Sequence, residues 1–159
     1  MQWAGLIAPE ATVLDVAAGK GRHSQFFAER GHRVTAVDCD TSALAPHSRI
    51  ESVQADLEDG SPWPLPDRSF GAVVVTNYLH RPLFPRLLGS IAPGGVLIYE
   101  TFMEGNERFG HPRRPEFLLK DGELLELVRC RLSVIAYEAR LISEPKMAMV
   151  QRIAARRAG

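Results

Sequence analysis

Short apolar runs alternate with polar, glycine- and proline-containing segments along the first hundred residues. Four runs have the pattern of buried strands: Thr12–Val16, Arg33–Val37, Ala72–Thr76 and Val96–Tyr99, with Ile50–Ala55 as a weaker fifth. They are rich in Val and Ile and are bounded by Gly, Pro or an acidic residue. This pattern is typical of parallel strands whose two faces are both covered.

Helical patterns occur at Gly21–Arg30, Leu83–Ile91 and Glu123–Val128. Strands that alternate with helices predict a parallel sheet with right-handed crossovers. Two further strand-like runs, Leu132–Tyr137 and Ala148–Ile153, have no room for a helix between them, so they predict an antiparallel hairpin. We therefore predict one α/β domain over residues 1–159, a Rossmann-like three-layer sandwich with a mostly parallel seven-stranded sheet and a C-terminal antiparallel hairpin.

Composition narrows the classes of partner. The chain has 19 basic and 19 acidic side chains, which argues against nucleic acid or an acidic membrane as the main partner. Its two cysteines and five histidines show no metal-ligand spacing, so we expect no metal site. No run has the length of a membrane span and no signal peptide is recognisable, so we expect a cytoplasmic protein. Oligomeric state is left open.

The stretch VLDVAAGKGRHS, residues 13–24, follows the first predicted strand into a helix. In an open α/β sheet, ligands bind beyond the carboxyl ends of the strands. The small residues Ala17, Ala18, Gly19 and Gly21 would let the backbone approach a ligand closely, and the helix that follows would direct free N–H groups at it.

Acidic residues at the strand ends indicate a nucleoside. Asp38 ends the second strand, where a carboxylate can accept hydrogen bonds from both ribose hydroxyls. Asp56 ends the third and could accept from an adenine amino group. Asp15 would repel a pyrophosphate but suits a ligand with an ammonium group, such as S-adenosylmethionine.

With these motifs the chain resembles the class I S-adenosylmethionine-dependent methyltransferases, in particular the small methyltransferase-domain and tellurite-resistance-type group. The resemblance covers nearly the whole chain. It is carried by VLDVAAGKGRHS, VTAVDCD, VQADLEDG, WPLPDRSFGAVVVTNYLH and APGGVLIYETF.

The resemblance implies roles for the residues around the first strand. In such proteins the first acid and the glycine loop cradle the methionine part of the cofactor, here Asp15 with Ala17, Gly19 and Gly21. Ala17 stands where many members have glycine, and alanine fits if its φ is negative.

The resemblance also implies roles for residues at the next three strand ends. Asp38 would hold the ribose, and Cys39 would pack on the adenine. Asp56 and the Leu57 backbone would read the adenine edge. Asn77, after the fourth strand, would face the methyl-transfer centre.

Only a short segment precedes the glycine loop, whereas many relatives carry a longer N-terminal helix over the cofactor. The site is then either more open than in those relatives, or the start of the chain has been assigned too late.

The segment TNYLHRP, residues 76–82, follows the fourth strand, where the family places groups near the acceptor. Tyr78 and His80 are candidate catalytic residues that could orient or deprotonate a nucleophile. Alternatively, His80 only starts a helix with Pro82 in its first turn.

Residues 100–117 predict a long loop of the kind that often forms a lid. Candidates for shaping an acceptor site there are Glu100, Thr101, Phe102, Asn106, Arg113 and Arg114.

The predicted function is methyl transfer from S-adenosylmethionine to a small-molecule acceptor by in-line displacement. Two alternatives stay open: a protein or RNA methyltransferase that relies on a partner and on the Arg113–Arg114 loop, and a module that binds the cofactor without catalysis.

Overall fold

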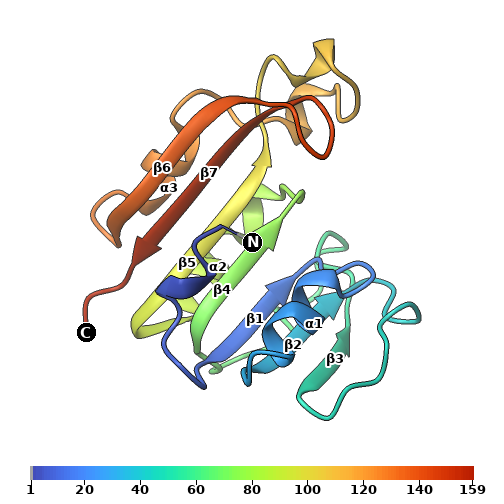
Figure 1. The fold of residues 1–159 in the computed structure, drawn as a ribbon, viewed down its shortest axis with the longest axis vertical. Coiled ribbons are helices and arrows are strands. Elements are labelled where there is room, and N and C mark those ends of the chain that lie inside the picture. Colours follow the sequence, from blue (N-terminus) through green and yellow to red (C-terminus); the bar gives the residue numbers. More distant parts are fainter. Residues whose placement is uncertain (1) are drawn as a thin grey trace.

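A seven-stranded sheet in the order β3-β2-β1-β4-β5-β7-β6 runs through the computed structural model, which describes residues 2–159 (Figure 1). The strands are β1 Thr12–Val16, β2 Arg33–Asp38, β3 Ile50–Gln54, β4 Phe70–Thr76, β5 Ile91–Phe102, β6 Ser133–Ile142 and β7 Ala148–Arg156. Strands β1 to β5 are parallel, whereas β7 is antiparallel to both β5 and β6. The predicted fold class and the C-terminal hairpin are confirmed.

Within the described residues, three short α-helices and four 3₁₀ turns accompany the sheet. They are α1 Arg22–Ala28, α2 Phe84–Gly89, α3 Glu123–Val128, η1 Ala4–Leu6, η2 Arg81–Leu83, η3 Asn106–Arg108 and η4 Pro115–Phe117. The helix predicted to reach Ile91 ends at Gly89, because Ile91 is fully buried and pairs with Phe70 as the first residue of β5. Strand β5 is therefore longer than predicted and passes through Pro93-Gly94-Gly95 at an irregularity in its pairing with β4.

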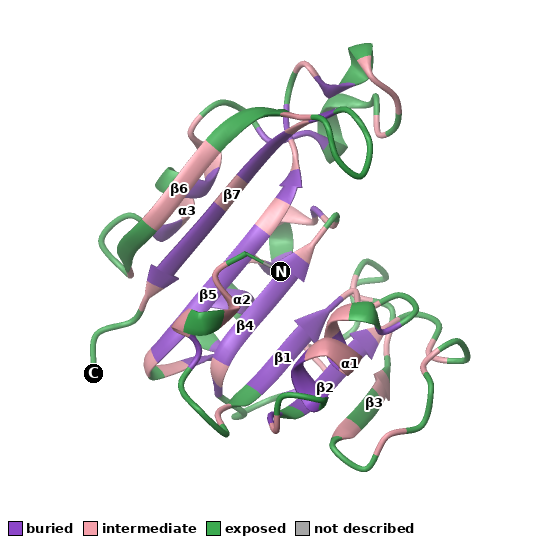
Figure 2. Ribbon diagram, viewed as in Figure 1, coloured by how far each residue is buried: buried purple, intermediate pink, exposed green. Residues whose placement is uncertain are grey.

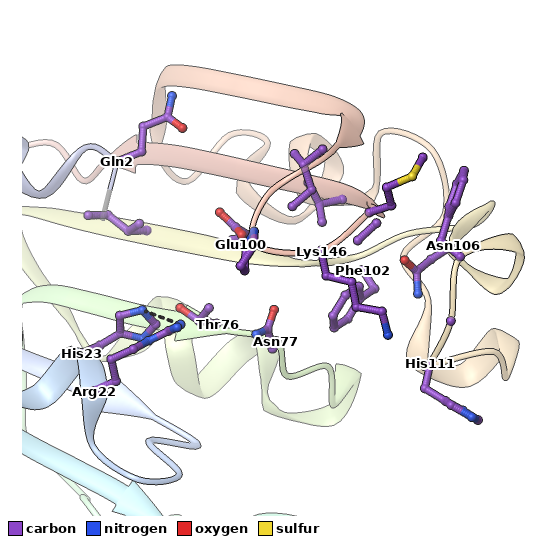
Figure 3. A pocket seen from close by; sticks show the side chains of 18 of the residues that line it. Gln2, Arg22, His23, Thr76, Asn77, Glu100, Phe102, Asn106, His111 and Lys146 are labelled. Carbon is purple, nitrogen blue, oxygen red and sulfur yellow. Dashed lines mark hydrogen bonds between the residues drawn. The ribbon is translucent and has the colours of Figure 1, made fainter.

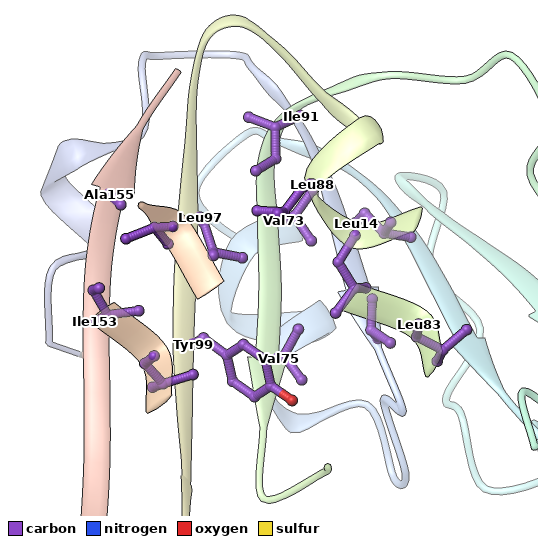
Figure 4. Packing of buried hydrophobic residues seen from close by; sticks show 14 of the residues in the cluster. Leu14, Val73, Val75, Leu83, Leu88, Ile91, Leu97, Tyr99, Ile153 and Ala155 are labelled. Carbon is purple, nitrogen blue, oxygen red and sulfur yellow. The ribbon is translucent and has the colours of Figure 1, made fainter. Parts of the chain in front are cut away.

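Alternate residues of each strand enter two separate cores, one on each face of the sheet. Leu14 and Val73 belong to the core under α2 and α3, shown in Figure 4, whereas their neighbours Val13 and Val74 pack with Phe27 of α1. Strands β1, β4, β5 and β7 are accordingly buried along most of their length, as Figure 2 shows. The rigid centre of the molecule thus lies directly below the ends of β1 and β4.

The crossovers on either side of β3 contain no helix among the described residues; residues 39–49 and 55–69 are irregular. Strand β3 is consequently an exposed edge strand (Figure 2). A polar network covers part of it: the Arg68 guanidinium donates to Glu51 Oε2 at 2.8 Å and to Thr35 Oγ1 at 2.9 Å.

Strand β7 holds the N-terminal segment in place. The guanidinium of Arg156 donates to the backbone oxygens of Gly94 at 2.9 Å and Leu6 at 3.1 Å, and Arg152 Nη1 donates to Gln2 Oε1 at 2.7 Å. These bonds fix residues 2–6 along β7, with Gln2 toward the edge of the sheet at which β1 and β4 end and Leu6 toward the edge at which they begin.

Within residues 2–159, no helix has the length and apolar character needed to cross a bilayer.

Candidate active site

Asp15 lies in β1 just before the glycine loop and is 2% exposed. The Ser24 hydroxyl, in the first turn of α1, donates to its Oδ2 at 2.6 Å. Burial outweighs this hydrogen bond and raises the pKa of the Asp15 carboxyl to about 6. A positively charged ligand group beside Asp15 would favour the ionised form, so the carboxyl is suited to an ammonium group.

The loop after β1 needs a left-handed backbone at three positions. Ala17 has φ 54°, Gly19 has φ 55° and Gly21 has φ 74°. The condition under which alanine would fit at position 17, a negative φ, is therefore not met: the chain turns there as it would with glycine, and alanine bears the strain. At Gly21 a Cβ atom would lie 2.5 Å from Leu44 Cδ2, so any other residue would have to displace the Leu44 side chain as well as bear the left-handed backbone.

Asp38, at the end of β2, closes this loop. Its Oδ2 accepts a hydrogen bond from the Gly19 N–H at 2.8 Å, and its Oδ1 accepts from the Asp40 N–H at 3.0 Å. The neighbouring Cys39 is exposed, and its thiol hydrogen bond to Asp38 raises the pKa of Cys39. The thiol accordingly stays protonated and presents a small surface rather than a nucleophile.

The chain turns after β3, and the Asp56 carboxylate stabilises this turn. Asp56 Oδ1 accepts from the Glu58 N–H at 2.9 Å, which is the local turn-stabilising contact that such an acid can make. Leu57 is partly buried against the core below. Asp56 is exposed, so its carboxylate still has acceptor sites that face solvent.

Asn77 follows β4 with φ 56°, a conformation that asparagine tolerates better than most residues. Its backbone N–H donates to the Glu100 carbonyl at 2.9 Å, which fixes it against the end of β5. Its side chain lines a cavity of about 530 Å³ (Figure 3).

The cavity lies between the start of α1, the ends of β4 and β5, the loop after β5 and the β6–β7 turn. Polar side chains on its lining are Gln2, Arg22, His23, Thr76, Asn77, Glu100, Asn106, His111 and Lys146. Apolar residues include Trp3, Phe26, Ile98, Phe102, Phe109, Met147 and Val150. A volume in this range is typical of small-molecule sites.

The charges around the cavity are unevenly paired. Glu100 is paired with Arg152, whose Nε lies 3.1 Å from Glu100 Oε2 although the two atoms are not aligned as a hydrogen bond. Arg22 Nη2 lies 3.3 Å from His23 Nε2. Burial, together with the Arg22 charge, lowers the pKa of His23 to about 4, so His23 is neutral at physiological pH.

A buried asparagine holds the loop wall of the cavity. Asn106 is 1% exposed; its side-chain amide donates to the Pro112 carbonyl at 3.1 Å, and its Oδ1 accepts from the Met149 N–H at 3.2 Å. The segment that carries Phe109 and His111 is therefore tied to β7.

The two candidate catalytic residues lie apart from this cavity. Tyr78 is half-buried; its hydroxyl has no hydrogen-bond partner among the described residues, and burial together with nearby Glu58 and Asp56 raises its pKa. It thus belongs to the adenine side of the predicted site. His80 precedes η2, as the alternative interpretation expected, and neither side chain lines the cavity.

Of the loop candidates, Glu100, Phe102 and Asn106 line the cavity, whereas Thr101 is buried elsewhere and does not. Arg113 and Arg114 are exposed and also do not line it.

The turn of the predicted C-terminal hairpin was not among the candidate site residues, yet it contributes Lys146 and Met147 to the cavity. The predicted antiparallel pairing contained the signal. An antiparallel strand after β6 has to begin near the carboxyl end of β5, as Phe102 opposite Val150 shows.

No group of three or more His, Cys, Asp or Glu side chains within residues 2–159 is arranged to hold a metal ion.

Comparison with known proteins places the chain among methyltransferases. Residues 13–95 match a family model described as a methyltransferase domain. An uncharacterized methyltransferase of Mycobacterium tuberculosis is 35% identical in an alignment 109 residues long, which covers 62% of this chain and 54% of the relative. The chain thus spans about half the length of that relative.

Two solved structures share the fold. TehB from Haemophilus influenzae superposes with a TM-score of 0.75 at 18% identity, over 97% of this chain and 59% of TehB. The second is a Burkholderia thailandensis 1,6-didemethyltoxoflavin-N1-methyltransferase, solved with bound 1,6-didemethyltoxoflavin and S-adenosylhomocysteine. It gives a TM-score of 0.67 at 23% identity, over 94% of this chain and 72% of the other.

Proposed function

We propose a methyl-transfer function for this chain, which belongs to the methyltransferase domain family. The proposed donor is S-adenosylmethionine and the proposed acceptor is a small molecule in the cavity beside Asn77. The observation that carries the proposal is that the cavity adjoins the glycine loop, where the cofactor would bind. Asn77 and Arg22 line the cavity, and they lie next to this loop, which follows Asp15 and is hydrogen-bonded to Asp38.

The residues present fit the cofactor. Asp15 is a buried carboxyl whose ionised form the ammonium group of the cofactor would favour. Arg22, which lines the cavity, can bind the methionine carboxylate. The Asp38 carboxylate can accept further hydrogen bonds from ribose hydroxyls. Cys39, Asp56 and Leu57 would lie beside the adenine, on the solvent-exposed side of the site.

Bound S-adenosylmethionine supplies a methyl group on a sulfonium: as a nucleophile bonds to the methyl carbon, the carbon–sulfur bond breaks and its electron pair stays on sulfur. The protein has to align the acceptor on the far side of that methyl group and exclude water, and alignment can contribute up to roughly 7–11 kcal/mol. Asn77, held by Glu100, and the apolar walls Phe102 and Phe109 perform this alignment.

Proton removal depends on the acceptor. Among the described residues, Glu100 is the one acidic side chain on the cavity lining, and it is ion-paired with Arg152 at 3.1 Å. Tyr78 and His80 stay predictions as catalytic residues, since both lie outside the lining.

The full chain can be tested with methyl-labelled S-adenosylmethionine and fractionated pools of thiols, small acids, tRNA and protein. Label in a small-molecule pool supports the proposal, and label confined to tRNA or protein contradicts the acceptor class. Thermal shift with S-adenosylhomocysteine but no label in any pool would favour a module that only binds. A shift with NAD alone would contradict the cofactor.

A further inference from the structure

We propose that the acceptor carries an oxyanion on an apolar body and that the Lys146 ammonium binds the oxyanion; this inference rests on the proposed methyl-transfer function. The chemistry required is a carboxylate or phosphate attached to a small ring or chain. Neither group is assigned to this site by the family match.

Among the charged side chains that line the cavity, Lys146 has no partner of opposite charge within the described residues. Among residues 2–159, Lys146 forms no ion pair, and the acidic lining residue Glu100 is already paired with Arg152. Arg152 in turn also lies 3.5 Å from Glu138. The other lining cation, Arg22, lies at the start of α1 beside the cofactor loop, where it is placed to meet the methionine carboxylate.

Lys146 is directed across the cavity rather than away from it. It lies in the β6–β7 turn, and in Figure 3 its side chain points toward the loop that carries His111. Its Nζ lies 3.1 Å from the position that a Cβ on Gly110 would take, so the ammonium packs over a residue without a side chain. The loop that Asn106 anchors therefore leaves room for the ammonium at the wall opposite the turn.

The other residues that line the cavity indicate what the rest of the acceptor is like. Phe102, Phe109 and the partly exposed Met147 contribute apolar surface to the same cavity. His111, from the loop that Lys146 approaches, adds a polar group. A cavity that offers an ammonium and these apolar side chains selects a molecule that is charged at one end and apolar along its body, because each part then loses little on leaving water.

Three probes of similar shape test the charge requirement: benzoate, phenyl phosphate and benzamide, each titrated by calorimetry into the full chain saturated with S-adenosylhomocysteine. We expect one of the two anions, or both, to bind at least about tenfold more tightly than the neutral amide, as a charge-assisted contact would give. Tighter binding of benzoate or of phenyl phosphate assigns the carboxylate or the phosphate class.

Lys146→Met should reduce the preference for the anions to less than about twofold, and Lys146→Arg should keep it. Lys120→Met is the matched control, because Lys120 is an exposed lysine outside the cavity lining, and it should change nothing. No preference for either anion, or a preference that survives Lys146→Met, overturns the inference. The preceding titration with S-adenosylhomocysteine separates the two proposals, since its failure would count against the proposed function instead.

Discussion

Two regions of the proposed site are held by different kinds of contact. One is the glycine loop after β1, and the other is the cavity wall formed by β5, the loop after β5, and β7. The loop is fixed by residues close in sequence: Ser24 binds Asp15 nine positions away, and Gly19 binds Asp38 at nineteen. The wall is fixed by partners far apart, such as Asn106 with Met149 at forty-three positions and Arg152 with Gln2 at one hundred and fifty. The cofactor side is therefore specified by a local motif, and the acceptor side by the assembly of the whole sheet.

The sharpest test of the cofactor side is Asp38→Ala. It removes both the bond that closes the loop and the proposed ribose acceptor, so S-adenosylhomocysteine should bind about 100-fold more weakly in calorimetry. Asp40→Ala is the control, because the Asp40 carboxylate only accepts from the Ser42 N–H in the same loop. Equal affinity of the Asp38 variant and the wild type would remove Asp38 from the site.

Asp15→Asn tests whether burial of this acid costs stability. Because the pKa of Asp15 in the folded state, about 6, lies above its usual value of 3.8, the protonated acid stabilises the fold at low pH. The wild-type free energy of unfolding should therefore fall as pH rises from about 4 to about 6. From pH 4.5 to 7.5 the Asn variant should gain about 2 kcal/mol relative to wild type in urea unfolding. Parallel pH profiles of the two proteins would contradict the buried, raised acid.

Arg152→Met tests the acceptor side. Arg152 is 11% exposed between Glu100 and Glu138, so its loss should lower the free energy of unfolding by about 1–2 kcal/mol. Arg140→Met removes an exposed partner of Glu138 alone and should cost almost nothing. Equal costs in chemical denaturation would mean that Arg152 does not organise the wall.

The smallest effect is expected at Ala17. Ala17→Gly should raise the free energy of unfolding by about 1 kcal/mol, because glycine adopts φ 54° without strain. Affinity for S-adenosylhomocysteine should not change. A loss of stability on this substitution would show that the alanine methyl group is needed for packing.

The same division explains what could be predicted from the sequence. The strands and the candidate cofactor residues follow from short apolar runs, each ended by an acid or glycine, since neighbouring residues decide these features. The φ of Ala17 could not be read from the sequence, because the course of the loop toward Asp38 fixes it. Lys146 could not be assigned from its own surroundings, because the contact that gives it meaning is with Gly110, thirty-six positions away.

The bonds from β7 to the N-terminal segment hold one side of the cavity in place. Gln2 and Trp3 form one side of it, and Arg152 and Arg156 clamp this side to the strand whose other end carries the hairpin turn. Moving this segment away from β7 would break the hydrogen bonds from Arg152 to Gln2 and from Arg156 to Leu6 together. At the hairpin end of the same strand, Lys146 meets the Gly110 loop, so β7 joins a hydrogen-bonded segment on one side of the cavity to the proposed charge-reading contact on another.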